Sequence, residues 1–364
     1  MAVRSMSPTA AAAAGAVCIS SSAVLMKLAH TSPSITALGR CAFALPVLGA
    51  LAWAERRRGA PPLPSRSRWL ARLAGLFLAG DLIVWSHAID AIGAGLSTVV
   101  GNLQVIIVAM LAWAFLGERP HRALVFAFPI MLGGLVLVGG LADVGGSRAY
   151  GADPALGVVY GVAVAVIYAI FILTLRQATA SQGPRTPGSR HAVAGVLFEA
   201  TVGATVASAL LGLVLNDYRV SPGSFPWPAL GWLALLALTS QVIGWLLITV
   251  SMPRLAAGMI GALLLIQPAG SVALSYVFLG ERPSALQLAG VALILAGVFV
   301  AVSGNRPRAA DRAAAEVLDV PARSGAAEDE DEAPGFGGVG RGVGVEVAVA
   351  GGDGESAGQA DGGG

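Results

Sequence analysis

The stretch NLQVIIVAMLAWAFLGERP, residues 102–120, returns 163 positions later as LIQPAGSVALSYVFLGERP, residues 265–283. Both copies end in Leu-Gly-Glu-Arg-Pro, and Gln104 of the first aligns with Gln267 of the second. The match continues into the Gly-rich segments that follow, where LGGLVLV aligns with LAGVFVA. A match of this length is improbable by chance, so the sequence indicates two related halves.

The composition around this repeat is typical of a membrane protein. Of the 364 residues, 55 % are hydrophobic and only 12 % are charged, whereas about 25 % are charged in a typical soluble domain. A helix needs about 20 apolar residues to cross a hydrocarbon layer about 30 Å thick. Ten apolar stretches meet this need, and their continuous rather than alternating pattern favours helices over a β-barrel. These predicted spans are 10–28, 33–53, 70–89, 94–116, 123–141, 156–175, 192–214, 229–250, 255–278 and 286–303.

The first span, 10–28, has two interpretations. A signal peptide would carry a charged segment before its apolar core. Arg4 is the only charge in that position. We therefore expect a retained helix.

Ten spans in two halves place five spans in each half. Because five is odd, the chain enters the second half from the opposite side of the membrane, so the second half is inverted relative to the first. Inverted repeats are typical of secondary transporters, which bind substrate near the midplane where the repeats meet. The sequence therefore predicts an all-α integral membrane fold of ten transmembrane helices in two inverted five-helix repeats. The expected repeats are 1–141 and 142–304, followed by a tail, 305–364.

Charged residues predict the orientation. Arginines favour the cytoplasmic side of a membrane. With the N-terminus inside, sixteen loop arginines face the cytoplasm and three face outward. We therefore expect a multi-pass protein of the cytoplasmic membrane with both termini in the cytoplasm. The tail carries five arginines and twelve acidic residues and is rich in glycine, a composition that predicts disorder.

Several polar side chains fall deep inside the predicted spans. A charge at the bilayer centre costs at least about 2.5–3.5 kcal/mol and usually lines a pathway. Asp81 lies about 16 Å into its span at 1.5 Å per residue, and Trp85 follows one turn later on the same face. Gln104 and Gln267 fall near the same level, which predicts a polar midplane site. The candidate pathway residues are Arg40, Asp81, Trp85, Asn102, Gln104, Tyr168, Glu199, Gln241, Trp245 and Gln267.

Structural roles compete with these functional ones. Gln104 and Gln267 are equally suited to interhelical hydrogen bonds. Tyr168 and Trp245 suit either stacking against a substrate or helix packing. Glu199 faces the cavity or lies near the cytoplasmic end of its span.

Asp81 is the sharpest candidate because the position that corresponds to it in the second half is the neutral Gln241. Arg40 is placed either to pair with Asp81 or to snorkel to the outer interface. A conformational change that alters the separation of Asp81 and Arg40 would change the proton affinity of the carboxyl. That mechanism would couple transport to protons, and structural ion pairing is the alternative.

Three further charged residues are interpreted as structural. Lys27 lies at the end of the first span, as an interface anchor does. Glu118 and Glu281, within the two Leu-Gly-Glu-Arg-Pro copies, are expected to be terminators that clasp the adjoining loops.

The sequence resembles the drug/metabolite transporter superfamily, in its EamA-like branch of ten-helix carriers. The resemblance covers residues 10–303. It rests on the duplicated helix ending in LGERP, the Gly-rich helix after each copy, and Arg40 in ALGRCAF. It implies a proton- or exchange-coupled carrier of a small metabolite such as an amino acid, a nucleoside or a drug. The second half has a family-like proline at Pro268, whereas Val105 occupies the first-half position.

Other functions fit less well. The histidines and the two cysteines are scattered without metal-ligand spacing, which disfavours an integral-membrane enzyme and predicts no metal or cofactor. Glycine clusters lack the lysine of a nucleotide loop. A passive channel or facilitator fits the repeat in part. The expected partners are a small-molecule substrate, protons and the lipid bilayer, with no nucleic acid, and a homodimer is compatible with the sequence.

Overall fold

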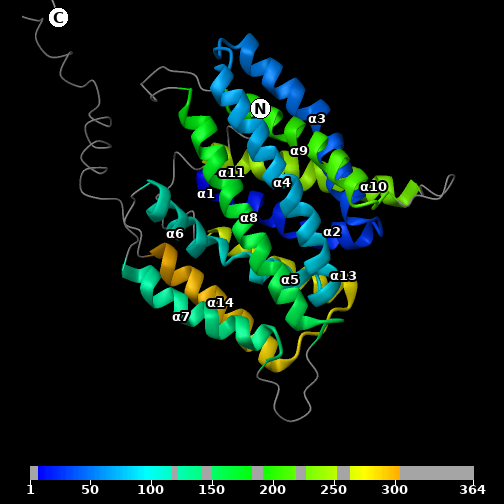
Figure 1. Cartoon of the computed structure of the whole chain (residues 1–364), viewed down its shortest axis with the longest axis vertical. Helices are drawn as coiled ribbons and strands as arrows, with labels where there is room; N and C mark the ends of the chain where they lie inside the picture. Colours follow the sequence, from blue (N-terminus) through cyan, green and yellow to red (C-terminus); the bar gives the residue numbers. More distant parts are fainter. Residues whose placement is uncertain are drawn as a thin grey trace, which may run out of the picture. The chain divides into compact units, whose positions relative to one another are not determined.

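The computed structural model describes residues 7–116, 122–141, 150–182, 192–218, 227–251 and 263–303. These residues form helices and short connections, with no strand among them (Figure 1). All of them belong to one compact unit, residues 1–311, and a second unit comprises residues 312–364. The predicted tail, 305–364, lies outside the described residues.

The helices follow the predicted spans along the chain, and several spans are built from more than one helical segment. The segments are α1 (Pro8–Ser20), α2 (Ser22–Leu28), α3 (Pro33–Arg57), α4 (Ser65–Ile92), α5 (Ala94–Gly101), α6 (Gln104–Leu116), α7 (Arg122–Val138), α8 (Pro154–Ala180), α9 (Val193–Val214), α10 (Trp227–Leu236), the π-helix η2 (Ala237–Gly244), α11 (Trp245–Ser251), α13 (Ile266–Leu279) and α14 (Ala285–Ser303).

The prediction of a multi-pass membrane protein is confirmed. Eight helical stretches among the described residues are long and apolar enough to cross a bilayer, and two further apolar helices, Arg122–Val138 and Ile266–Leu279, are shorter. These two correspond to the predicted spans 123–141 and 255–278. The count of ten crossings therefore stays a prediction.

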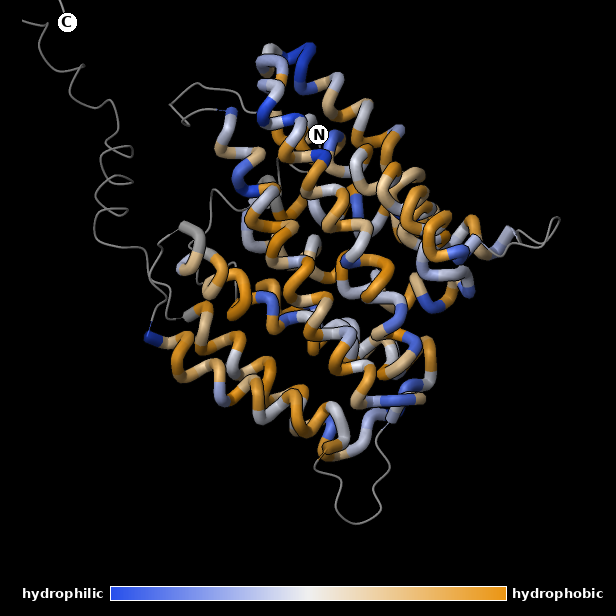
Figure 2. Tube along the Cα trace, in the orientation of Figure 1, coloured by the Kyte–Doolittle hydropathy of each residue, from blue (hydrophilic) through white to orange (hydrophobic). Residues whose placement is uncertain are grey.

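Hydrophobic residues dominate the helices along the trace (Figure 2), and many large apolar side chains are exposed. Phe126 is 67 % exposed, Val277 70 % and Phe299 51 %. Exposed apolar area on this scale is unusual for a soluble protein. Lipid is the solvent that such a surface requires.

Small residues let neighbouring helices approach closely. The helices α7 and α14 lie side by side (Figure 1). A Cβ added to Gly134 of α7 would lie 2.6 Å from the carbonyl oxygen of Gly290 in α14, and the reverse holds for Gly290. Close glycine contacts of this kind are typical of membrane helices, which associate through packing rather than through the hydrophobic effect.

The two halves share structural landmarks at the repeat spacing of 163 residues. The ranges of α7, Arg122–Val138, and α14, Ala285–Ser303, correspond at this spacing. The chain makes a turn at Asn102 and Leu103 between α5 and α6, and another at Leu265 just before α13. Leu265 is the repeat equivalent of Asn102, so both halves interrupt a helix at the same point.

Candidate functional site

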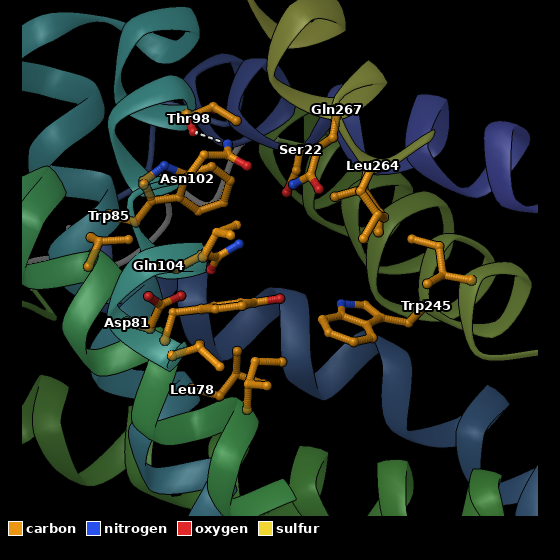
Figure 3. Close-up of a pocket in the computed structure, with 18 of the residues that line it drawn as sticks. Ser22, Leu78, Asp81, Trp85, Thr98, Asn102, Gln104, Trp245, Leu264 and Gln267 are labelled. Atoms are coloured by element: carbon orange, nitrogen blue, oxygen red, sulfur yellow. Dashed lines mark hydrogen bonds between the residues drawn. The ribbon is translucent and has the colours of Figure 1, made fainter. Parts of the chain in front are cut away.

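A cavity of about 410 Å³ lies among helices of both halves. Its walls come from helices α1 to α6 in the first half and from α8, α11, α13 and α14 in the second (Figure 3). Eight of the ten predicted pathway residues line this cavity. They are Arg40, Asp81, Trp85, Asn102, Gln104, Tyr168, Trp245 and Gln267.

Asp81 contributes a carboxyl group from the middle of α4. The residue is only 4 % exposed, and its buried Oδ1 atom has no hydrogen-bond partner among the described residues. Figure 3 shows the carboxyl near Gln104 at the cavity wall. A buried polar group without a partner costs free energy. A donor group of a solute or of water would supply the missing hydrogen bond, and protonation would remove the buried charge.

Arg40, on α3, is held by neutral partners rather than by Asp81. Its Nε donates to Gln241 Oε1 at 3.0 Å, Nη1 to Ser22 Oγ at 2.8 Å and Nη2 to Ser240 Oγ at 3.2 Å. No ion pair within 4.0 Å joins it to Asp81. Neither sequence interpretation of Arg40 describes this arrangement, because the side chain is buried yet unpaired with an acid.

The π-helix η2 explains how two of these partners reach Arg40. Ser240 and Gln241 are consecutive residues of η2 and are both buried. Wider helical turns of this type occur frequently at functional sites. Gln241 does not line the cavity, so its contact with the site runs through Arg40. The serine partners were missed by the sequence analysis because single serines in apolar helices carry no distinctive pattern.

Three aromatic residues, Trp85, Tyr168 and Trp245, are part of the cavity wall. Figure 3 shows Trp85 and Trp245 on different sides of it. Phe171 packs edge-on against both Tyr168 and Trp245, with ring centroids 5.4 and 6.2 Å apart. Phe171 therefore positions two rings of the wall. Phe171 lies three residues after Tyr168 and so on the same helix face. This spacing is the sequence signal that could have identified Phe171 as part of the site.

Three side-chain amides add polar surface to the cavity. Asn102 donates through Nδ2 to the carbonyl oxygen of Thr98 at 2.7 Å. The Gln104 and Gln267 side chains make no hydrogen bond within the described part of the chain. Their amides are therefore available to a solute or to water in the cavity.

Glu199 lies away from the cavity. Its Oε2 accepts from Arg72 Nε at 2.7 Å, and the arginine side chain is 56 % exposed. Such a pair at a helix surface contributes little to stability. The structure thus separates Glu199 from the other predicted pathway residues.

Glu281 forms a junction between the two halves outside the cavity. Its Oε1 accepts from Lys27 Nζ at 3.1 Å and from the backbone N–H of Ala94 at 2.8 Å, and its Oε2 accepts from Gly95 N–H at 3.1 Å. Lys27, interpreted from the sequence as an interface anchor, is thus one of its partners. The repeat-related Glu118 lies outside the described residues.

The comparisons with known proteins agree with this fold. A model of the EamA-like transporter family matches residues 7–140 and 155–303. A solved structure described only as "Crystal structure of protein" is 21 % identical, with a TM-score of 0.52, and the match covers 81 % of this chain and 96 % of that one. That likeness concerns the fold alone. No curated protein matches the chain.

Proposed function

Because the chain belongs to the EamA-like transporter family, a family of membrane transporters, we propose that it is a secondary active carrier. It moves a small metabolite or drug-like solute across the cytoplasmic membrane by alternating access. The observation that carries this proposal is the cavity of about 410 Å³ with the buried, unpartnered carboxyl of Asp81 in its wall. Cavities that bind small molecules combine mostly apolar walls with a few placed polar groups.

The arrangement of the halves supports alternating access. Both halves contribute to the cavity, and both interrupt a helix beside it, at Asn102 and at Leu265. Interrupted helices at a repeat interface are typical of carriers whose halves rock against each other. The proposed topology is ten crossings in two inverted repeats, with both termini in the cytoplasm.

Coupling to protons or to exchange is assigned to Asp81. The only other ionisable side chains at the cavity wall, among the described residues, are those of Arg40 and Tyr168. Arg40 is engaged by three neutral acceptors. A movement of α4 relative to α3 would change the distance between the two charges and hence the proton affinity of Asp81.

Transport by purified protein in proteoliposomes tests the proposal. Vesicles preloaded with a candidate solute should take up the labelled solute faster than empty vesicles, and the uptake should saturate. Linear uptake without stimulation from the opposite side would instead indicate a passive facilitator. Asp153→Asn is the matched control for Asp81→Asn, because it makes the same chemical change at a different place. Asp153 caps α8 by accepting from Leu156 N–H, away from the cavity.

A further inference from the structure

We propose that Glu281 is a gate residue that latches one end of the transport pathway shut and releases when that end opens. The inference rests on the proposed alternating-access function, because a gate requires a pathway that opens in turn at each end. It gives a dynamic role to a residue that the sequence indicates only as a loop clasp.

We refer to the contacts of Glu281 with Lys27, Ala94 and Gly95 as the latch. The latch joins the two halves at three points. Glu281 follows α13 of the second half, whereas Lys27 of α2 and the start of α5 belong to the first. The carboxylate is 1 % exposed and accepts three charge-assisted hydrogen bonds. Bonds of this class are shorter and stronger than neutral ones. Three contacts between the halves at this end therefore depend on one side chain.

The backbone before α5 is shaped to admit the carboxylate. Gly93 separates α4 from α5 with φ of +98°, a conformation that other residues rarely adopt. A Cβ at Gly93 would lie 2.9 Å from Glu281 Oε2. The glycine thus provides both the break between the helices and the space in which the carboxylate reaches the N–H groups of Ala94 and Gly95.

A second contact continues the closure from the latch toward the cavity. Thr98 Oγ1 of α5 lies 3.0 Å from Ser271 Oγ of α13. At 1.5 Å per residue, Thr98 is about 6 Å along the helix from Ala94. Thr98 itself lines the cavity. The cavity is therefore separated from this end of α5 by the Glu281 contacts and then by the Thr98–Ser271 contact.

The latch is chemically suited to release. The N–H groups of Ala94 and Gly95 are among the first of α5, which have no acceptor within their own helix. Water can replace Glu281 at these groups without unwinding α5. Lys27 is already 31 % exposed at its side chain. Opening this end exchanges bonds to Glu281 for bonds to water, and the helices themselves stay intact.

Cysteine labelling tests the gate without requiring a known solute. In a chain with Cys18 and Cys41 replaced by alanine, Thr98→Cys places a thiol in the cavity wall at the end that the latch closes. A membrane-impermeant thiol reagent, added on the side of the membrane where the latch lies, should modify this thiol slowly. Glu281→Gln weakens the charge-assisted bonds and should accelerate labelling about tenfold or more. Lys27→Met should accelerate it in the same direction, and Lys27→Arg should restore slow labelling.

The control is Asp153→Asn, which changes a helix-capping carboxylate that does not bridge the halves and should leave the labelling rate unchanged. A folded Glu281→Gln protein that is labelled at the parental rate would show that Glu281 is a permanent brace and overturn the gate. If Glu281→Gln does not fold, the labelling rates of Lys27→Met and Lys27→Arg decide instead. Labelling of a folded Lys27→Met protein at the parental rate would then overturn the gate.

A disulfide gives an independent measurement. Thr98→Cys combined with Ser271→Cys places two sulfurs where hydroxyl oxygens now lie 3.0 Å apart. Oxidation should lock this end and stop exchange, and a reductant should restore it. Full exchange by the oxidised protein would refute the gate. A labelling response without any transport would retain the gate and count against the carrier, so the two proposals fail separately.

Discussion

Asp81 and Arg40 line one cavity without forming an ion pair. Arg40 is satisfied by serine and glutamine side chains, whereas the buried Oδ1 of Asp81 has no partner in the parts of the chain that the structure describes. Two buried opposite charges that stabilised the fold would be expected to meet. Their separation favours a role for the carboxyl in the transport cycle over structural ion pairing.

Asp81→Asn tests this assignment directly. The substitution removes the charge but keeps the shape, and Oδ1 has no hydrogen bond to lose within the described part of the chain. We expect the melting temperature to stay within about 3 °C of the parent. Accumulation driven by a proton gradient should be abolished, with exchange retained. Normal accumulation with unchanged pH dependence would contradict the coupling role, and failure to fold would favour the structural one.

Arg40→Lys is expected to damage the site despite conserving the charge. A lysine ammonium cannot reproduce the planar set of donors that reaches Ser22, Ser240 and Gln241. Leaving a buried polar group unsatisfied costs about 1–3 kcal/mol. The variant should therefore melt at a lower temperature than the parent and bind solute more weakly. Equal affinity and stability would show that charge alone is needed at this position.

The sequence could predict the site where depth and helix periodicity suffice. Asp81, Gln104 and Gln267 are conspicuous as polar residues at the middle of apolar spans, and Trp85 follows Asp81 by one helical turn. All four line the cavity. These arguments depend only on position along a helix. The rise per residue places a side chain at a depth even when its neighbours are unknown.

Contacts between distant segments could not be predicted in the same way. Glu281 meets Lys27 across 254 positions of the chain, and no local pattern links them. The π-helix η2 brings Ser240 and Gln241 to Arg40, and its wider turn has no signature in the sequence. Glu199 was placed by depth alone, and its partner Arg72 comes from another helix.

The proposed orientation can be checked by labelling single cysteines in intact cells. The sixteen-to-three bias of loop arginines places residue 65 inside and residues 147 and 221 outside. Ser147→Cys and Ser221→Cys should react with an impermeant thiol reagent added outside. Ser65→Cys, at the start of α4, should react only after the membrane is permeabilised. Strong outside labelling at position 65 would reverse the topology.

Two adjacent glycines of α7 offer the most closely matched comparison in the fold. A Cβ on Gly134 would lie 2.6 Å from the carbonyl oxygen of Gly290 and 2.7 Å from Ile294 Cγ1. A Cβ on Gly133 would meet nothing within 4 Å. Both positions lie in the same helix, so both replacements gain similar helix propensity. Only the first forces α7 away from α14.

We therefore expect Gly134→Ala to destabilise the protein by about 1–3 kcal/mol, as overpacking of a close contact does. Gly133→Ala should be neutral or slightly stabilising. Thermal unfolding of the two variants in the same detergent measures the difference. Equal melting temperatures would show that α7 and α14 do not rely on this glycine contact. A larger loss in Gly133→Ala would mean that the side of α7 that carries Gly133 is the more tightly packed one.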